Sequence, residues 1–186
     1  RTFVKIMLIG KDGMIGKSIL TRFPKKNLIS FSKNEFDLEK KDNIIQILDR
    51  YKPDIFINAA AYTNVNSSEN QKIKVKRINS DSLLIIAKKL KTLNSLLIHY
   101  STDYVFDGKK KFAYTEEDFT NPLQYYGFSK KLAEQNILKI NCKHIILRTS
   151  WVYSKFGNNF VNKLINQKKN FKSIEVVNDE YGTPTS

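Results

Sequence analysis

Several residue types that mark particular classes of protein are scarce in this 186-residue sequence. Cys142 is its one cysteine, which excludes an internal disulfide framework and is typical of a reducing compartment. No apolar run approaches the ~18 residues that a membrane-spanning helix needs. The opening residues, RTFVKIMLIGKDG, lack the cleavage region of a secretory signal peptide. These absences predict a cytoplasmic protein with no membrane partner.

Potential metal ligands are equally scarce. The two histidines, His99 and His144, lie within apolar segments, where a lone histidine is most often a hydrogen-bonded core residue, and neither is assigned a role. Nowhere do His, Cys, Asp and Glu show the spacing of metal ligands. We therefore expect no bound metal.

Acidic residues are outnumbered, with 18 Asp and Glu against 32 Lys and Arg and a net charge of +14. A basic surface can bind nucleic acid or an anionic ligand. The lysines, however, are spread along the whole chain in small groups, and no recognised nucleic-acid-binding motif accompanies them. We expect no nucleic-acid partner, and a steep salt dependence of duplex binding would be needed to indicate one.

Apolar segments alternate with amphipathic segments throughout the chain. The apolar segments predict strands over 4–9, 27–32, 54–61, 95–101, 143–150 and 173–178. The amphipathic segments predict helices over 10–23, after a glycine loop, and over 38–51, 70–93, 123–140 and 159–169. Nearly continuous apolar strands are expected where helices cover both faces of a parallel sheet. The pattern predicts an α/β protein with a doubly wound, Rossmann-like parallel sheet.

Three glycines, Gly10, Gly13 and Gly16, lie between the first strand and the first helix. A nucleotide pyrophosphate needs a tight turn, close backbone approach and free N–H groups at a helix N-terminus, and this pattern supplies all three. The alternative is an ordinary βα turn that needs its glycines only for packing. In the context of a doubly wound sheet we favour a dinucleotide cofactor.

The end of the second strand bears on which dinucleotide binds. NAD-selective sites usually have an acid there for the ribose 2′-hydroxyl. This chain has Ser32 and Lys33, which suit a 2′-phosphate, so NADPH is preferred and NADH remains an alternative. If Lys33 is only one more solvated lysine, this preference is lost.

Tyr126 and Lys130 are four residues apart in a predicted helix and therefore share one face. A nearby ammonium lowers the pKa of a phenol, and bringing that pKa from ~10 to ~7 requires about 4 kcal/mol. Such a tyrosine can protonate a carbonyl oxygen, and a hydroxyl at the end of the fourth strand can hydrogen-bond the same oxygen, with Thr102 as the candidate and Ser101 as the second choice. The alternative is a packed tyrosine beside an exposed lysine.

Several sequence motifs longer than the glycine loop point to one protein family. The chain resembles the extended short-chain dehydrogenase/reductase superfamily and, within it, the dTDP-4-dehydrorhamnose reductase family. The stretches STDYVFDG and RTSWVY are far more distinctive than the glycine loop. The matching motifs are GKDGMIG (10–16), NAAAYTNV (58–65), HYSTDYVFDG (99–108), YYGFSKKLAE (125–134), RTSWVYSKFGNNF (148–160) and VNDEYGTPTS (177–186).

The resemblance implies an oxidoreductase that reduces the C4 keto group of dTDP-4-dehydro-6-deoxy-L-mannose to dTDP-L-rhamnose with NADPH. Tyr126 would be the acid, Lys130 would hold the nicotinamide ribose and lower the tyrosine pKa, and Thr102 would orient the carbonyl. Members of the family that use Mg²⁺ have an acid early in the first helix where this chain has Ser18, so the resemblance also implies no metal.

The remaining site residues are implied in the same way, with packing as the alternative for Tyr104 and Trp151. The substrate contacts would be Thr102, Asp103, Tyr104 and Trp151. The cofactor contacts would be Gly10, Gly13, Met14, Ile15, Ser32, Lys33, Asp37, Leu38, Ala61, Tyr62, Thr63, Tyr126 and Lys130.

The family's members have a longer C-terminal part that forms much of the nucleotide-sugar domain. We therefore expect a fragment in which 1–186 is the NAD(P)-binding domain and 151–186 is the start of the substrate region. The expected partners are a small nucleotide-sugar substrate and a second copy in a homodimer. Two alternatives remain: a non-catalytic NADP-binding subunit resembling the methionine adenosyltransferase β subunit, and a related nucleotide-sugar epimerase or 4-ketoreductase.

Overall fold

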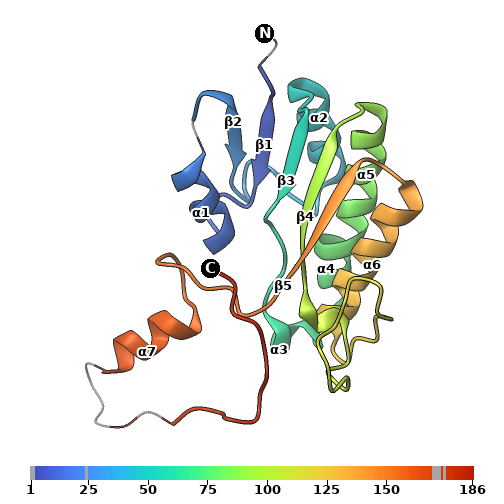
Figure 1. The fold of residues 1–186 in the computed structure, drawn as a ribbon. Coiled ribbons are helices and arrows are strands. Elements are labelled where there is room, and N and C mark those ends of the chain that lie inside the picture. Colours follow the sequence, from blue (N-terminus) through green and yellow to red (C-terminus); the bar gives the residue numbers. More distant parts are fainter. Residues whose placement is uncertain (1–2, 24, 169–172, 174) are drawn as a thin grey trace.

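The computed structural model describes residues 3–23, 25–168, 173 and 175–186 (Figure 1). Its centre is a parallel sheet with the strand order β2-β1-β3-β4-β5. The doubly wound α/β fold predicted from the sequence is confirmed. The strands are β1 (Ile6–Ile9), β2 (Leu28–Phe31), β3 (Ile55–Asn58), β4 (Leu96–Thr102) and β5 (His144–Thr149).

Helices cover both faces of the sheet, α1 on one face and α2, α5 and α6 together on the other (Figure 1). Right-handed crossovers require this arrangement, because the chain moves outward from β1 to β2 and then returns past β1 to β3. The α-helices are α1 (Met14–Arg22), α2 (Lys41–Tyr51), α3 (Val65–Ser68), α4 (Lys72–Lys76), α5 (Ser82–Thr92), α6 (Tyr125–Ile140) and α7 (Phe160–Lys168).

The core lies between the sheet and the layer formed by α2, α5 and α6. Strand residues such as Phe56 and Leu97 are fully buried there, as are Leu48 of α2, Leu90 of α5 and Ile137 of α6. Burying a side chain of this size contributes about 1.5–3 kcal/mol. This layer therefore supports the strand ends at which the polar residues described below are found.

A π-turn, η2 (Arg77–Asp81), interrupts the helix predicted over 70–93 and separates α4 from α5. The wider turn places the buried Asn79 against Tyr62 and Ser129. Asn79 Oδ1 accepts from Tyr62 N at 2.8 Å, and Asn79 Nδ2 donates to Tyr62 O at 3.1 Å and to Ser129 Oγ at 2.9 Å. The apolar stripe gave no sign of this turn, because polar contacts determine it.

The prediction of a strand over 173–178 is wrong for residues 173 and 175–178, and residue 174 lies outside the described residues. A strand needs neighbouring backbone groups for its ladder, and these positions are exposed. Further along the chain, Thr185 forms an isolated parallel bridge with Val152.

The strand order reverses between β1 and β3. The connection after β1 leads to β2 on one side, whereas the connection after β3 leads to β4 on the other side. In doubly wound sheets, ligands bind in the crevice outside the carboxyl ends of the strands at such a reversal.

Candidate active site

A cleft of about 780 Å³ lies at this carboxyl edge, lined by residues that follow β1, β2, β3 and β4 together with residues of α6. It brings together nearly all the site residues predicted from the sequence. The predicted residues that line it are Gly10, Gly13, Met14, Ile15, Lys33, Asp37, Leu38, Ala61, Tyr62, Thr63, Thr102, Asp103, Tyr104, Tyr126, Lys130 and Trp151.

The glycine loop brings backbone very close to backbone. Gly10 has a φ of +82°, and a Cβ atom there would lie 2.7 Å from the backbone of Ala59. A Cβ atom on Gly16 would lie 2.1 Å from the carbonyl oxygen of Gly10. Only glycine fits at these two positions, so the strand, loop and helix meet as tightly as a phosphate-binding turn requires.

The N-terminus of α1 faces the cleft without a side chain to cap it. Gly13 is the N-cap residue and has no capping group, and the first turn of α1 contains no acidic residue. The N–H groups of a first helical turn have no partner within the helix, and the helix dipole favours negative charge there. Met14 and Ile15 line the cleft at this point, so the residues present fit a dinucleotide pyrophosphate.

Ser32 is the predicted cofactor residue that does not line the cleft. Its Oγ and its backbone N both donate to Glu35 Oε2 at 2.7 Å, and Lys11 Nζ donates to the same oxygen at 2.7 Å. The hydrogen bond from Lys11 and those from Ser32 lower the pKa of the Glu35 carboxyl to about 2. The hydroxyl expected to meet a 2′-phosphate is thus bonded to a carboxylate, and Lys33 alone of the pair faces the cleft.

Tyr126 is largely buried at the start of α6, and its pKa differs from the sequence-based expectation. Burial raises the pKa of the phenol to about 12, and a hydrogen bond with the Thr102 side chain only partly opposes this rise. The negative charge of Asp103 raises the pKa further. Lys130 is not among the groups that shift this pKa, so the expectation that it lowers the pKa of Tyr126 is not met.

Lys130 lies one turn further along α6 and is 2% exposed. Its Nζ donates to the carbonyl oxygen of Tyr100 at 2.6 Å and lies 3.2 Å from Nε2 of His99. Burial lowers the pKa of Lys130 to about 8, with Glu134 acting in the opposite direction. Lys130 is therefore still mainly ammonium at neutral pH, but its balance with the amine lies much closer to neutrality than that of an exposed lysine.

Thr102 ends β4 and is joined to the short helix η3 (Asp103–Val105). Its Oγ1 accepts from Tyr104 N at 3.2 Å and donates to Asp103 Oδ1 at 3.1 Å. The ring of Tyr104 meets that of Tyr126 edge-on, with 5.9 Å between centroids. Gly127 permits this contact, since a Cβ atom there would lie 2.1 Å from Tyr104 O. The predicted hydroxyl and the predicted acid therefore lie on adjoining elements.

Trp151 follows β5 at the wall of the cleft and is 49% exposed. It has a φ of +44°, and Gly182 lies against its indole, where an added Cβ would be 2.5 Å from Cε2. The segment near the end of the described chain is thus folded back onto the cleft wall.

Asn58 and His99 are polar site residues without a role in the sequence-based prediction. They are directly paired across β3 and β4, and both are fully buried. Asn58 Nδ2 lies 3.0 Å from His99 Nδ1. The available signal was one polar residue within each of two adjacent apolar strands, at the end of β3 and in the middle of β4, and it becomes informative only once the register is known.

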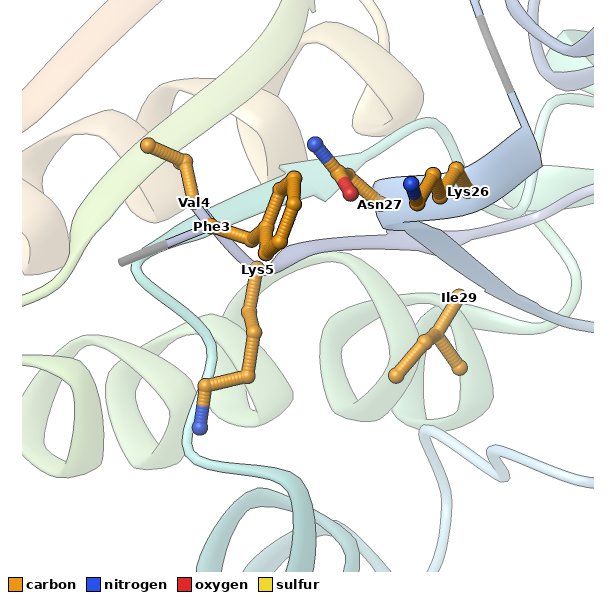
Figure 2. Close-up of a pocket in the computed structure, with 6 residues that line it drawn as sticks. All are labelled: Phe3, Val4, Lys5, Lys26, Asn27 and Ile29. Atoms are coloured by element: carbon orange, nitrogen blue, oxygen red, sulfur yellow. The ribbon is translucent and has the colours of Figure 1, made fainter. Parts of the chain in front are cut away.

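A second hollow, of about 180 Å³, lies at the opposite edge of the sheet (Figure 2). It is lined by the start of the chain and the region around β2, with Lys26 Nζ 5.1 Å from the centroid of the Phe3 ring. It contains no carboxylate, histidine or hydroxyl group, so it offers no candidate for acid–base chemistry.

Two absences hold for the part of the chain that the structure describes. No group of three or more His, Cys, Asp and Glu residues there could hold a metal ion. None of its helices has the length and apolar character needed to cross a membrane. Ser18, where Mg²⁺-using relatives would have an acid, donates instead to Met14 O at 3.0 Å.

Residues 4–186 match the family model described as the RmlD substrate binding domain. The chain belongs to this family. The resemblance stated from the sequence motifs is thereby confirmed.

Relatives of this RmlD-family chain include dTDP-4-dehydrorhamnose reductase of Aggregatibacter actinomycetemcomitans, 37% identical over 184 residues that cover 97% of this chain and 63% of the relative. The dTDP-4-dehydrorhamnose reductase of Salmonella typhimurium strain LT2 is also 37% identical, over 98% of this chain and 62% of its own length. The chain thus spans less than two thirds of the curated relatives it matches.

Solved structures agree with this assignment. The dTDP-4-dehydrorhamnose reductase from Bacillus anthracis in complex with NADP has a TM-score of 0.95 and 32% identity, over 99% of this chain and 66% of that one. The ortholog from Clostridium acetobutylicum has a TM-score of 0.93 and 34% identity, over 98% of this chain and 65% of that one.

Proposed function

We propose that this protein reduces the C4 keto group of dTDP-4-dehydro-6-deoxy-L-mannose to dTDP-L-rhamnose with NADPH. The observation that carries the proposal is that Thr102, Tyr126 and Lys130 line one cleft with the uncapped N-terminus of α1. The names of its relatives and the NADP complex of the Bacillus anthracis reductase support the same chemistry.

The cofactor would be held by residues that the structure places along the cleft. Met14 and Ile15 offer N–H groups to the pyrophosphate, and Asp37 and Leu38 flank the adenine. Lys33 is the cation left to meet a 2′-phosphate, because Ser32 is bonded to Glu35. NADH therefore stays open as a second cofactor.

NADPH, when bound, supplies the hydride that the keto carbon receives. Tyr126 donates its phenolic proton to the keto oxygen, so the product is an alcohol and the tyrosine is left as phenolate. A pKa near 12 keeps the phenol protonated before the reaction but makes it a weak acid, so it gives up its proton only to the more basic alkoxide that develops as the hydride arrives. Thr102 holds the keto oxygen beside the phenol, and Asp103, Tyr104 and Trp151 face the sugar.

Tyr126→Phe tests the proposed acid. We expect turnover of dTDP-4-dehydro-6-deoxy-L-mannose to fall at least about 100-fold, because general acid catalysis contributes 10²–10⁴-fold. NADPH affinity is expected to stay within a few-fold, measured by calorimetric titration alongside NADPH oxidation. Near-normal turnover in this variant would remove Tyr126 from the role.

The same assay separates the two alternatives. NADPH binding by the wild-type chain without oxidation would favour a non-catalytic NADP-binding subunit. Oxidation with a different 4-keto nucleotide sugar, but not with this one, would favour a sister ketoreductase. The homodimer and the cytoplasmic location stay predictions.

A further inference from the structure

A buried hydrogen-bonded chain connects β3, β4 and α6 beneath the cleft. It begins at Ala60, passes through Asn58 and His99, and ends at Lys130. His99 is fully buried and does not line the cleft, so it can act only through its neighbours.

The orientation of the Asn58 amide is determined by its backbone partner. Ala60 N donates to Asn58 Oδ1 at 3.0 Å, which turns Asn58 Nδ2 towards His99 Nδ1, 3.0 Å away. An amide NH₂ only donates, so His99 Nδ1 must accept. A neutral imidazole that accepts at Nδ1 has its proton on Nε2.

The Nε2–H group of His99 then points at Lys130 Nζ, 3.2 Å away. An ammonium has three donors and no acceptor, whereas an amine has a lone pair. Nζ can donate to the Tyr100 carbonyl oxygen at 2.6 Å in either form. The network is therefore complete with the amine, whereas the ammonium leaves two donors facing each other.

The other tautomer of His99, with its proton on Nδ1, would require the Asn58 side-chain amide to be flipped. It would leave the Ala60 N–H facing an NH₂ group and so without an acceptor. An unpaired buried donor is unfavourable by about 1–3 kcal/mol. The backbone after β3 thus selects the tautomer of a histidine on β4.

We propose that His99 is a positioning residue which, held by Asn58, directs an N–H group at Lys130 Nζ and favours the amine over the ammonium. The inference rests on the proposed reductase function only for the importance of Lys130. Burial independently lowers the pKa of Lys130, and it holds the pKa of His99 well below its ordinary value, so His99 stays neutral.

The negative charge of Glu134 favours the ammonium form of Lys130 and so opposes the effect of His99. Glu134 lies one turn further along α6, but its carboxylate accepts from Arg148 Nη2 at 2.7 Å and from Ser101 Oγ at 2.5 Å. Tyr126, on the same helix, stays protonated below a pH of about 12. Because the Glu134 carboxylate is already paired with Arg148 and Ser101, the Nε2–H group of His99 is the neighbour that favours the amine form of Lys130 over the ammonium form.

Asn58→Asp is the decisive variant. A carboxylate accepts from Ala60 N and from His99 Nδ1–H, so the histidine proton moves to Nδ1 and Nε2 becomes an acceptor for an ammonium. We expect the titration midpoint of Lys130 Nζ to rise by at least about one pH unit, a tenfold change in proton affinity. The pH profile of kcat/KM should shift in the same direction, with the KM for the sugar little changed.

Histidine ¹H–¹⁵N correlation spectra measure the tautomer without any turnover. The chain has two histidines, so His144→Gln assigns the His99 signals and is also the matched control, because His144 contacts Cys142 O outside the cleft. We expect the wild type to carry its proton on Nε2 of His99 and Asn58→Asp to carry it on Nδ1.

A wild-type His99 protonated at Nδ1, or at both nitrogens near neutral pH, would overturn the inference, as would an unchanged Lys130 midpoint in a folded Asn58→Asp protein. If Asn58→Asp does not fold, the wild-type spectrum alone decides. A correct tautomer in a protein that oxidises no NADPH would leave this inference standing and refute the reductase.

Discussion

Burial shifts the pKa values of the two residues that define the site in opposite directions. It holds Tyr126 in its neutral, protonated form and moves Lys130 towards its neutral, deprotonated form. In both cases the interior disfavours the ion, so neither group reaches its ordinary pKa.

Lys130→Met tests this burial through stability. Lys130 titrates near 10.5 when unfolded but at about 8 when folded, so between these values the unfolded chain binds more protons. The free energy of unfolding then rises with pH across this window. Relative to the variant, the wild type should gain about 3 kcal/mol, measured by urea unfolding at the two ends of the window.

Lys139→Met is the control, because Lys139 is exposed on the same helix. It should show no such change in relative stability with pH. A stability difference between wild type and Lys130→Met that is constant across the window would mean that the lysine is not buried in solution.

For single residues, the sequence predicted the pair of Tyr126 and Lys130 but not the hydrogen-bond partners of the side chains around the cleft. The i, i+4 spacing of Tyr126 and Lys130 and the hydroxyl of Thr102 were enough to place three groups in one cleft. The surroundings were not predictable for two reasons. The sequence offers Ser32 several nearby polar partners without showing that its hydroxyl turns to Glu35, and the pairing of His99 with Asn58 depends on strand register across the fold.

Helix α6 contains a conflict between local preference and packing. Gly127 lies in its first turn, where helix propensity alone predicts that alanine would stabilise by up to about 1 kcal/mol. Contact with Tyr104 O, 2.1 Å from an added Cβ, opposes this. We expect Gly127→Ala to destabilise by at least about 1 kcal/mol in urea unfolding and to lower turnover, since Tyr126 moves with the helix.

Gln135→Ala supplies the comparison, because Gln135 is exposed on the same helix. It should be neutral or slightly stabilising, as propensity predicts. A stabilised Gly127→Ala protein with normal turnover would contradict the close approach of α6 to η3.

A second prediction for an element concerns the π-turn η2, whose Asn79 holds the backbone of Tyr62. Asn79→Ala removes the partners of both backbone groups of Tyr62, so we expect a loss of about 3 kcal/mol in the free energy of unfolding. NADPH affinity should fall as well, because residues 61–63 line the cleft. Urea unfolding and calorimetric titration measure the two effects.

Asn136→Ala separates stability from binding. Asn136 donates to Ser80 in the same π-turn but does not line the cleft. It should weaken folding while NADPH affinity stays within a few-fold. Equal losses of affinity in the two variants would show that Asn79 has no special effect on the cleft.

Elements were predictable wherever apolar periodicity determined them. The predicted segments contain β1, β2, β3 and β5, and β4 extends one residue beyond the predicted 95–101, to Thr102. The helix predicted over 38–51 differs only in beginning at Lys41. Periodicity failed at η2, where amide contacts determine the backbone. It also failed at 173 and 175–178, where the described residues are exposed and form no strand. The short α3 and η3 were missed because one turn has no measurable period.

The whole molecule should gain stability from its cofactor. A ligand at 100 times its Kd stabilises the folded state by about 2.7 kcal/mol, which for a chain of this size raises Tm by about 5–10 °C. We expect this shift with NADPH in calorimetric melting, and the same shift in Tyr126→Phe. Gly16→Ala should abolish it, because the added Cβ cannot fit against Gly10 O.

An absent shift in the wild type would indicate that the part of the protein described here does not bind NADPH by itself. The length comparison makes this a meaningful outcome, since the relatives extend well beyond the matched region.

Trp151 is the single tryptophan of the chain, and its half-exposed indole forms part of the cleft wall. Reduced nicotinamide absorbs where indole emits, so occupancy of the cleft would quench the protein's intrinsic fluorescence and excite that of the cofactor. The molecule therefore contains its own optical reporter, and every variant that leaves position 151 intact can be titrated without a label.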